Sequence, residues 1–134
     1  MGKRRAGREL ALKLLFQGHA IECRITAEDW QNDFLAAGGK VDSFLPPGGP
    51  GVRIDTHLYP GYVVPPFYDA LLAKLVVWGR NRQEAMARAQ RALDEFRIDG
   101  LKTTIPFHQS VLNNAFFRRG EIAENFIHRR MDLT

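Results

Sequence analysis

The sequence predicts an α+β fold in which a small antiparallel sheet packs against two or three helices, with a basic helix before it. Short runs of alternating apolar and polar residues, separated by Gly/Pro turns, are typical of half-buried strands. A longer stretch, 82–96, repeats its apolar residues at the helical period. The chain has 134 residues and 45% hydrophobic content, which is enough for one modest core and argues against disorder.

The net charge of +4 belongs to the first 17 residues. Residues 1–17 contain five Lys/Arg and one Glu, whereas residues 18–134 contain fourteen of each sign. We therefore predict two parts, a basic helical arm over 1–17 and a domain over 18–134. The helical spacing of the leucines and alanines from Leu10 to Leu15 predicts a helix over 4–16 that ends near Gly18.

The cations of the arm allow two interpretations: Lys3, Arg4, Arg5 and Arg8. They could bind RNA phosphates, or they could form a solvated helix start. Positive charge at a helix N-terminus opposes the macrodipole, which favours a functional reason. The string R-R-A-G-R-E-L-A-L-K-L-L-F-Q (4–17) resembles the first helix of the antitermination factor NusB family, whose all-helical fold binds RNA.

Four strands are predicted in the domain: 19–26, 40–45, 52–58 and 70–78. In the first, Cys23 shares a face with Ile21 and Ile25, so we interpret it as a small core residue; the alternative is a nucleophile. The fourth is nearly all apolar, which predicts a strand covered on both faces, with a buried helix as the competing interpretation.

Helices are predicted over 82–96, 103–114 and 123–131. Asn81 and Glu84 form an N-x-x-E capping box before the first of these. Thr103 or Thr104 caps the second, and Pro106 lies in its first turn.

Several classes of chemistry have no pattern in this sequence. The histidines are scattered and lack thiolate partners, no nucleophile elbow precedes a His and an Asp, and no Walker-type phosphate loop occurs. No apolar run is long enough to span a membrane. A single cysteine cannot form an internal disulfide, so we expect a reducing, cytoplasmic location.

The strongest candidate for function is Arg53, which follows the Pro/Gly loop 46–51. Strand alternation places it on the same face as Asp55 and His57, opposite Val52 and Ile54. A guanidinium fork suits a carboxylate, a bicarbonate or an enolate-like oxygen. Glu22 and Arg24, on the strand predicted over 19–26, are further possible neighbours. Two interpretations stay open for Arg53, an anion site and a simple ion pair with Asp55 or Glu22.

Longer motifs carry a second resemblance. These are G-H-A-I-E-C-R-I-x-A-E-D (18–29), P-P-G-G-P-G-V-R-x-D-T-H-x-Y (46–59), G-Y-x-V-P-P-x-Y-D-x-L-x-A-K-L (61–75) and W-G-x-x-R…A-L-x-E-F-x-I-x-G-x-x-T-T (78–104). In this order they resemble the C-terminal domain of biotin carboxylase over residues 18–131. One departure lies at 30–39, where that family has a Pro-containing A-E-D-P…P-S-x-G pattern.

The resemblance implies an ATP-dependent ligase that joins bicarbonate to biotin with MgATP, as a component of acetyl-CoA carboxylase in fatty acid synthesis. The family arginine that contacts biotin corresponds to Arg53, so the resemblance implies that Arg53 is both a catalytic and a substrate-binding residue. ATP and Mg²⁺ are handled by an ATP-grasp region that we expect this chain to lack, so we expect no activity from the chain alone. Partners implied are the ATP-grasp portion, biotin carboxyl carrier protein, and a second copy through 78–82. The alternatives are a non-catalytic dimerisation or docking module, and RNA binding through residues 1–17.

Overall fold

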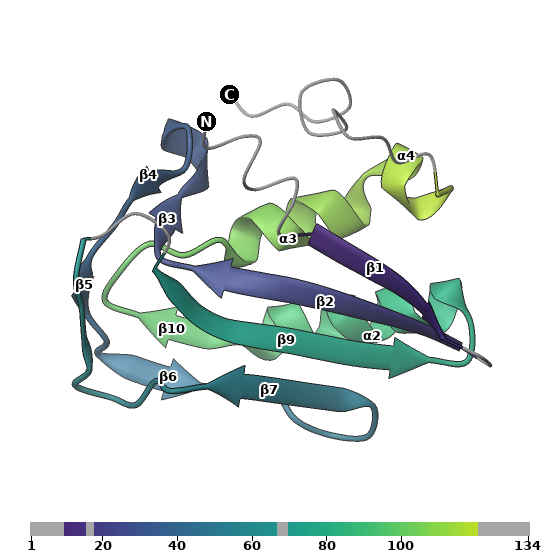
Figure 1. The fold of residues 1–134 in the computed structure, drawn as a ribbon, viewed down its shortest axis with the longest axis horizontal. Helices are drawn as coiled ribbons and strands as arrows, with labels where there is room; N and C mark the ends of the chain where they lie inside the picture. The colour runs from purple at the N-terminus through teal and green to yellow at the C-terminus, as the bar shows by residue number, and fades with distance from the viewer. Residues whose placement is uncertain (1–9, 16–17, 67–69, 121–134) are drawn as a thin grey trace.

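The computed structural model describes residues 10–15, 18–66 and 70–120. The order of elements combines strands with three α-helices and a short 3-10 helix (Figure 1): β1 (Leu10–Leu15), β2 (Gly18–Thr26), β3 (Glu28–Asp29), η1 (Trp30–Asn32), β4 (Leu35–Ala36), β5 (Gly39–Lys40), β6 (Ser43–Leu45), β7 (Val52–Thr56), β8 (Val63–Val64), β9 (Leu71–Gly79), α2 (Arg82–Glu95), β10 (Arg97–Asp99), α3 (Ile105–Asn113) and α4 (Ala115–Arg118). The predicted α+β class is confirmed.

The main sheet has four antiparallel strands in the order β1-β2-β9-β7. Strands predicted over 19–26, 52–58 and 70–78 all belong to it, although β7 ends at Thr56. The prediction for 40–45 was wrong in its pairing, because β6 pairs with β10 and β5 pairs with β8 in separate two-stranded sheets. The chain changes partner between them: the Val41 amide bonds to the Tyr62 carbonyl, and the Asp42 amide bonds to that of Asp99.

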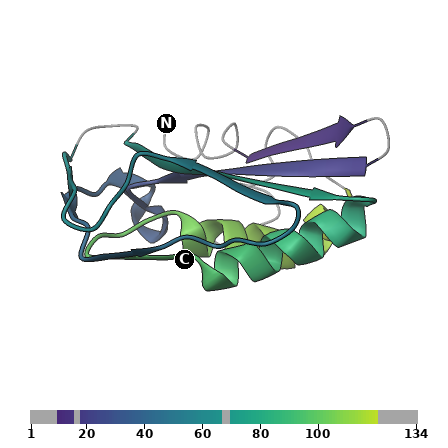
Figure 2. The same cartoon turned by 90° about the horizontal axis from the view of Figure 1, so that it is seen from below.

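Helices α2 and α3 cover one face of the main sheet, as the two perpendicular views show (Figures 1 and 2). The other face, which we call the open face, is turned away from them. β9 therefore differs from our prediction of a strand covered on both sides. Among the described residues only one face of it is buried, and Lys74 and Trp78 on the other face are exposed. The apolar composition of β9 did not indicate this asymmetry, because Val76 is apolar although it lies on the open face, where it is only half-buried.

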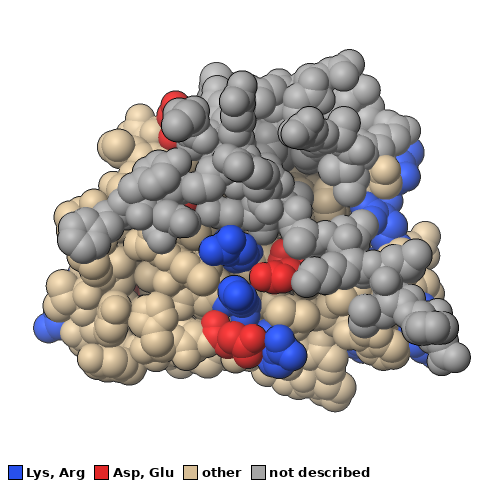
Figure 3. All heavy atoms as spheres, in the orientation of Figure 1, with Lys and Arg blue, Asp and Glu red and all other residues tan. Residues whose placement is uncertain are grey.

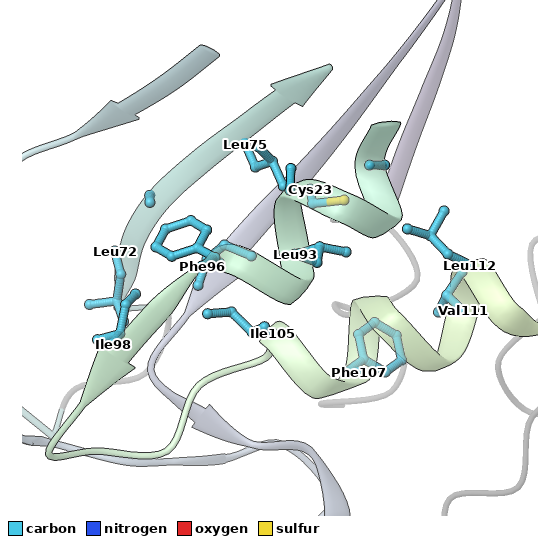
Figure 4. Packing of buried hydrophobic residues seen from close by; sticks show 14 of the residues in the cluster. Cys23, Leu72, Leu75, Leu93, Phe96, Ile98, Ile105, Phe107, Val111 and Leu112 are labelled. Carbon is cyan, nitrogen blue, oxygen red and sulfur yellow. The ribbon is translucent and has the colours of Figure 1, made fainter. Parts of the chain in front are cut away.

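The core lies between the sheet and these helices. Alternate residues of β2 and β9 point into it and meet α2, α3 and β10 (Figure 4). The members labelled there are Cys23, Leu72, Leu75, Leu93, Phe96, Ile98, Ile105, Phe107, Val111 and Leu112. Burying each large apolar side chain contributes about 1.5–3 kcal/mol, so this cluster is the main hydrophobic contribution of the described residues to folding.

The helix predictions are confirmed where the structure describes them. The Asn81 side chain accepts a hydrogen bond from the Glu84 amide at 2.9 Å, as the capping box predicts, and α2 follows. Thr104 is the N-cap residue of α3, as one of the two predictions had it, but its side chain makes no cap hydrogen bond. The Thr103 hydroxyl instead accepts from the Ile105 amide at 3.3 Å, and Pro106 lies in the first turn. The predicted helix over 123–131 lies outside the described residues.

The arm differs from the prediction. Leu10–Leu15 forms strand β1, which pairs with β2 from Leu10↔Cys23 to Leu15↔Gly18, so the predicted helix is wrong for these residues. The physical reason is that helix propensity is a weak prior and a short isolated helix is marginal in water. The edge of β2 offers a ladder of backbone hydrogen bonds instead. Residues 4–9 and 16, also assigned to that helix, lie outside the described residues.

The departure segment at 30–39 forms η1 and the hairpin β3–β4. Asp33 and Phe34 have φ values of 56° and 57°, in the left-handed region that non-glycine residues seldom adopt. Phe34 is buried and meets the Phe107 ring edge-on, with 5.1 Å between centroids. The insertion of this ring into the core holds the unusual turn in place.

Candidate functional site on the open face

Arg53 lies on the edge strand β7 and points to the open face. Its neighbours Val52 and Ile54 pack partly against the core, so alternation turns Arg53 and Asp55 outward, as predicted. Their side chains are 70% and 52% exposed, and Arg53 Nη2 donates to Asp55 Oδ2 at 3.1 Å. Arginine has five N–H donors, so this bond orients the guanidinium and leaves most of its donors available.

The sheet register brings three further charged residues alongside. Arg53 is opposite Val76, which is opposite Glu22 on β2. Asp55 is opposite Lys74, which is opposite Arg24. Charged side chains accordingly gather at the middle of the face seen in Figure 3. Glu22 and Arg24 were expected as possible neighbours of Arg53, whereas Lys74 was not. Only the pairing of β9 between β2 and β7 places Lys74 there.

His57 was predicted on the same surface, but β7 ends one residue before it. The Thr56 hydroxyl donates to the Leu72 carbonyl at 2.7 Å and accepts from the Leu58 amide at 3.1 Å, which bends the chain. The exposed His57 ring then meets Tyr62 edge-on, with 5.1 Å between centroids. His57 thus contacts the following turn and does not continue the row of Arg53 and Asp55.

The Pro/Gly loop before β7 is fixed by helix α2. Gly51 has a φ of 74°, and a Cβ there would lie 2.5 Å from Arg88 Nη1. Arg88 donates to the Trp78 carbonyl, and the Trp78 amide donates to the Gly51 carbonyl at 2.9 Å. Glycine at 51 is therefore required by its backbone conformation. Because the loop is held at Gly51, the position of Arg53, two residues after it, is also defined.

Cys23 is in the core, 1% exposed, and this confirms the predicted interpretation. Burial, with a smaller contribution from the Glu22 charge, raises the pKa of its thiol to about 12. A thiol with that pKa is almost entirely protonated at neutral pH and is a poor nucleophile.

The described residues contain no group of three or more His, Cys, Asp or Glu side chains placed to hold a metal ion. His19, His57 and His108 are separate, and His128 lies outside the described residues. None of the helices in the described part of the chain is long and apolar enough to cross a membrane.

A buried polar cluster beneath the strands was not predicted. The Thr26 amide donates to the Thr104 hydroxyl at 3.0 Å, and the Thr26 hydroxyl donates to Glu28 Oε1 at 2.6 Å. His108 Nε2 lies 2.9 Å from the Arg24 carbonyl, and burial lowers the pKa of this imidazole to about 4 although the hydrogen bond opposes the shift. Apart from Thr26 and Glu28, the bonded residues are 78 to 84 positions apart in sequence, so local patterns carry no signal for these contacts.

Similarity to known proteins identifies the family. The model for the biotin carboxylase C-terminal domain matches residues 22–129. The biotin carboxylase of a Nostoc species is 51% identical over 115 residues, which cover 86% of this chain and 26% of that protein. The solved structure of the biotin carboxylase–beta-gamma-ATP complex from Campylobacter jejuni has a TM-score of 0.81 and 45% identity, over 85% of this chain and 25% of that one. The chain belongs to the biotin carboxylase C-terminal domain family and spans about a quarter of the length of the curated relatives it matches.

One relative also extends into the arm. Biotin carboxylase 1 of Bacillus subtilis is 48% identical over 125 residues, which cover 91% of this chain and 28% of that protein. Residues 18–134 make up only 117 residues, so this similarity includes part of residues 1–17. Together with the pairing of β1 and β2, it connects the end of the arm to the domain. The boundary at 17/18 stays a prediction.

Proposed function

We propose that this chain works as the C-terminal part of a biotin carboxylase, in which Arg53 contacts biotin and stabilises negative charge as bicarbonate is joined to it. The observation that carries the proposal is the geometry of Arg53. Its side chain is 70% exposed on the open face, and one guanidinium nitrogen bonds to Asp55. Arg53 lies on β7, the strand within the motif of residues 46–59.

The chemical role follows from the donors that remain. When biotin loses its ureido proton, negative charge develops on the ureido oxygen, and a fixed cation beside that oxygen lowers the barrier. Because Asp55 and the loop hold Arg53 before substrate arrives, little of this stabilisation is spent on ordering the side chain. A flexible lysine lacks the planar fork and would serve less well.

The ATP, Mg²⁺ and bicarbonate chemistry is proposed for an ATP-grasp portion that this chain contacts. Several large apolar side chains are exposed in the described part of the chain and support such contact: Leu35, Leu45, Tyr59, Val63 and Trp78, from 40% to 67% exposed. Contact with another surface would remove the apolar area of these side chains from water. The same observation supports the second candidate, a docking or self-association module without chemistry of its own.

The proposal is tested by biotin- and bicarbonate-dependent ADP release in a mixture of this chain with a separately expressed ATP-grasp portion. We expect activity in the mixture and none in either part alone. Arg53→Gln should reduce the activity of the mixture by about 100-fold or more, the range for removal of one oxyanion-stabilising donor. Arg53→Lys should recover only part of it.

Arg97→Gln is the matched control, because Arg97 is an exposed strand arginine paired to Asp99 at 3.8 Å, with 65% of its side chain exposed. It should leave the activity unchanged. Full activity of the Arg53→Gln mixture would contradict the catalytic role. Binding of the two parts without activity in any mixture would favour the docking module.

A further inference from the structure

Arg24 and Lys74 form an unusual pair on the open face. They are directly opposite each other in the β2–β9 register. Like charges directly opposite across two strands destabilise a sheet. A sheet that retains such a pair carries a cost that folding alone does not explain.

Neither side chain is neutralised by the described residues. Lys74 is exposed and forms no ion pair with them, and the guanidinium of Arg24 donates no hydrogen bond to any of them. The Nε of Arg24 is fully buried and has no hydrogen-bond partner among the described residues. A buried donor without an acceptor costs about 1–3 kcal/mol, and such an atom in a folded protein is usually satisfied by a water, an ion or a ligand.

The neighbouring carboxylates offset only part of this charge. Asp55, on the other side of Lys74, bonds to Arg53 at 3.1 Å. Glu22, two residues before Arg24, has an interaction of its own. The face therefore presents three cations and two carboxylates over three adjacent strands, with the Arg24–Lys74 pair in the row next to Arg53.

We propose that Arg24 and Lys74 form a binding site for a small oxyanion, such as a bicarbonate, a carboxylate or a phosphate, adjacent to Arg53. An oxyanion between the two side chains would relieve their repulsion and accept a hydrogen bond from the buried Nε of Arg24. Charge-assisted bonds of this kind are roughly twice as strong as neutral ones. That the anion is a carboxylation substrate rests on the proposed function. The existence of an oxyanion site at Arg24 and Lys74 does not.

The test is an NMR titration of the isotope-labelled chain with bicarbonate, acetate, phosphate and chloride at constant ionic strength. We expect saturable shifts of the amides in 22–25 and 73–76 with at least one oxyanion and none with chloride. Lys74→Met and Arg24→Met should each weaken this binding by about tenfold or more, as expected for loss of one charged hydrogen bond. Comparing the oxyanions identifies the source, since preference for bicarbonate or acetate indicates a substrate-type ligand and preference for phosphate a phosphoryl group.

Two variants separate this site from other effects. Lys40→Met removes another exposed lysine, on β5, and should leave binding unchanged. Arg53→Gln should abolish activity in the reconstituted carboxylase but retain oxyanion binding, so the proposed function and this site can fail independently. Thermal unfolding should show that Lys74→Met is at least as stable as the parent chain, because the repulsion between Arg24 and Lys74 is gone. If Arg24→Met does not fold, oxyanion binding is tested with Lys74→Met and Lys74→Gln.

Equal shifts with chloride, non-saturating shifts, or unchanged affinity in the Lys74 variants would overturn the proposal. Loss of stability in Lys74→Met would also contradict it, since it would mean that the lysine has a structural partner. Saturable oxyanion binding that disappears in these variants and survives in Lys40→Met would establish the site.

Discussion

The two faces of the main sheet are built from the same strands and have opposite properties. On one face Cys23, Leu75 and Val77 are at most 1% exposed beneath α2 and α3. On the open face the alternate residues Arg24, Lys74 and Arg53 are charged. Because side chains of a strand alternate, one sequence can place its stability on one side and its chemistry on the other. Substitutions on the two faces should therefore have separable effects, and the following predictions test how complete the separation is.

The largest effect should come from the buried face. Leu75 is 0% exposed at the centre of β9 and packs in the core. Leu75→Ala should lower the free energy of unfolding by about 2–5 kcal/mol, through lost apolar burial and the cavity left behind. Urea unfolding followed by circular dichroism measures it, and a change below about 1 kcal/mol would show that the core relaxes around the site or was not well packed.

The stability of the protein should fall at acid pH because of His108 in the buried polar cluster. His108 has a folded-state pKa lowered to about 4, below the ordinary value of 6.5, because burial disfavours its charged form. The unfolded chain therefore binds more protons between these values, so stability is complete above pH 6.5 and falls as the pH drops toward 4. The loss should reach roughly 3 kcal/mol at about 1.4 kcal/mol per pKa unit.

Unfolding free energies measured across this pH range test the prediction, with His108→Gln as the comparison. The variant has no imidazole to titrate, so it should be less stable at neutral pH and show a flatter acid profile. An identical pH dependence in both proteins would assign the acid sensitivity to other groups.

A smaller effect is predicted at the start of α2. Asn81→Ala removes the acceptor of the Glu84 amide and should cost about 1 kcal/mol. Asn81→Asp retains a cap acceptor and should recover the stability. Equal losses in the two variants, measured by thermal unfolding, would mean that the cap bond contributes little.

The smallest effect on stability should come from the open face. Arg53→Gln breaks an ion pair whose partners are 70% and 52% exposed, and exposed pairs of this kind contribute little. We expect a change within about 0.5 kcal/mol in the free energy of unfolding. A decrease in the free energy of unfolding comparable with that of Leu75→Ala would show that the open face also contributes to stability and would contradict the separation.

The sequence allowed prediction where the signal was local. The Pro/Gly loop and alternation from Val52 to Asp55 placed Arg53 and Asp55 on one face, and the capping box predicted the start of α2. Partner choice was not predictable in the same way. The 40–45 segment divides between two small sheets, and Leu10–Leu15 is a strand because the edge of β2 is available to it.

The candidate site was predictable to the same extent. Arg53 came from its motif, whereas Lys74 sat in an apolar run that suggested burial on both faces. Its position opposite both Asp55 and Arg24 depends on the order β2-β9-β7, in which the middle strand comes last in sequence. The hydrogen bond from Arg88 to the Trp78 carbonyl, next to the Gly51 loop, and the contact of His108 with the Arg24 carbonyl likewise depend on tertiary structure.

We propose that the open face carries the chemistry through Arg53, whereas the opposite face carries the stability. The most direct measurement is biotin-dependent ADP release by Arg53→Gln in the reconstituted carboxylase, at a temperature where unfolding curves show the variant as folded as the parent chain. Our account predicts a loss of about 100-fold or more at unchanged stability. Parent-level activity in that folded variant would contradict it.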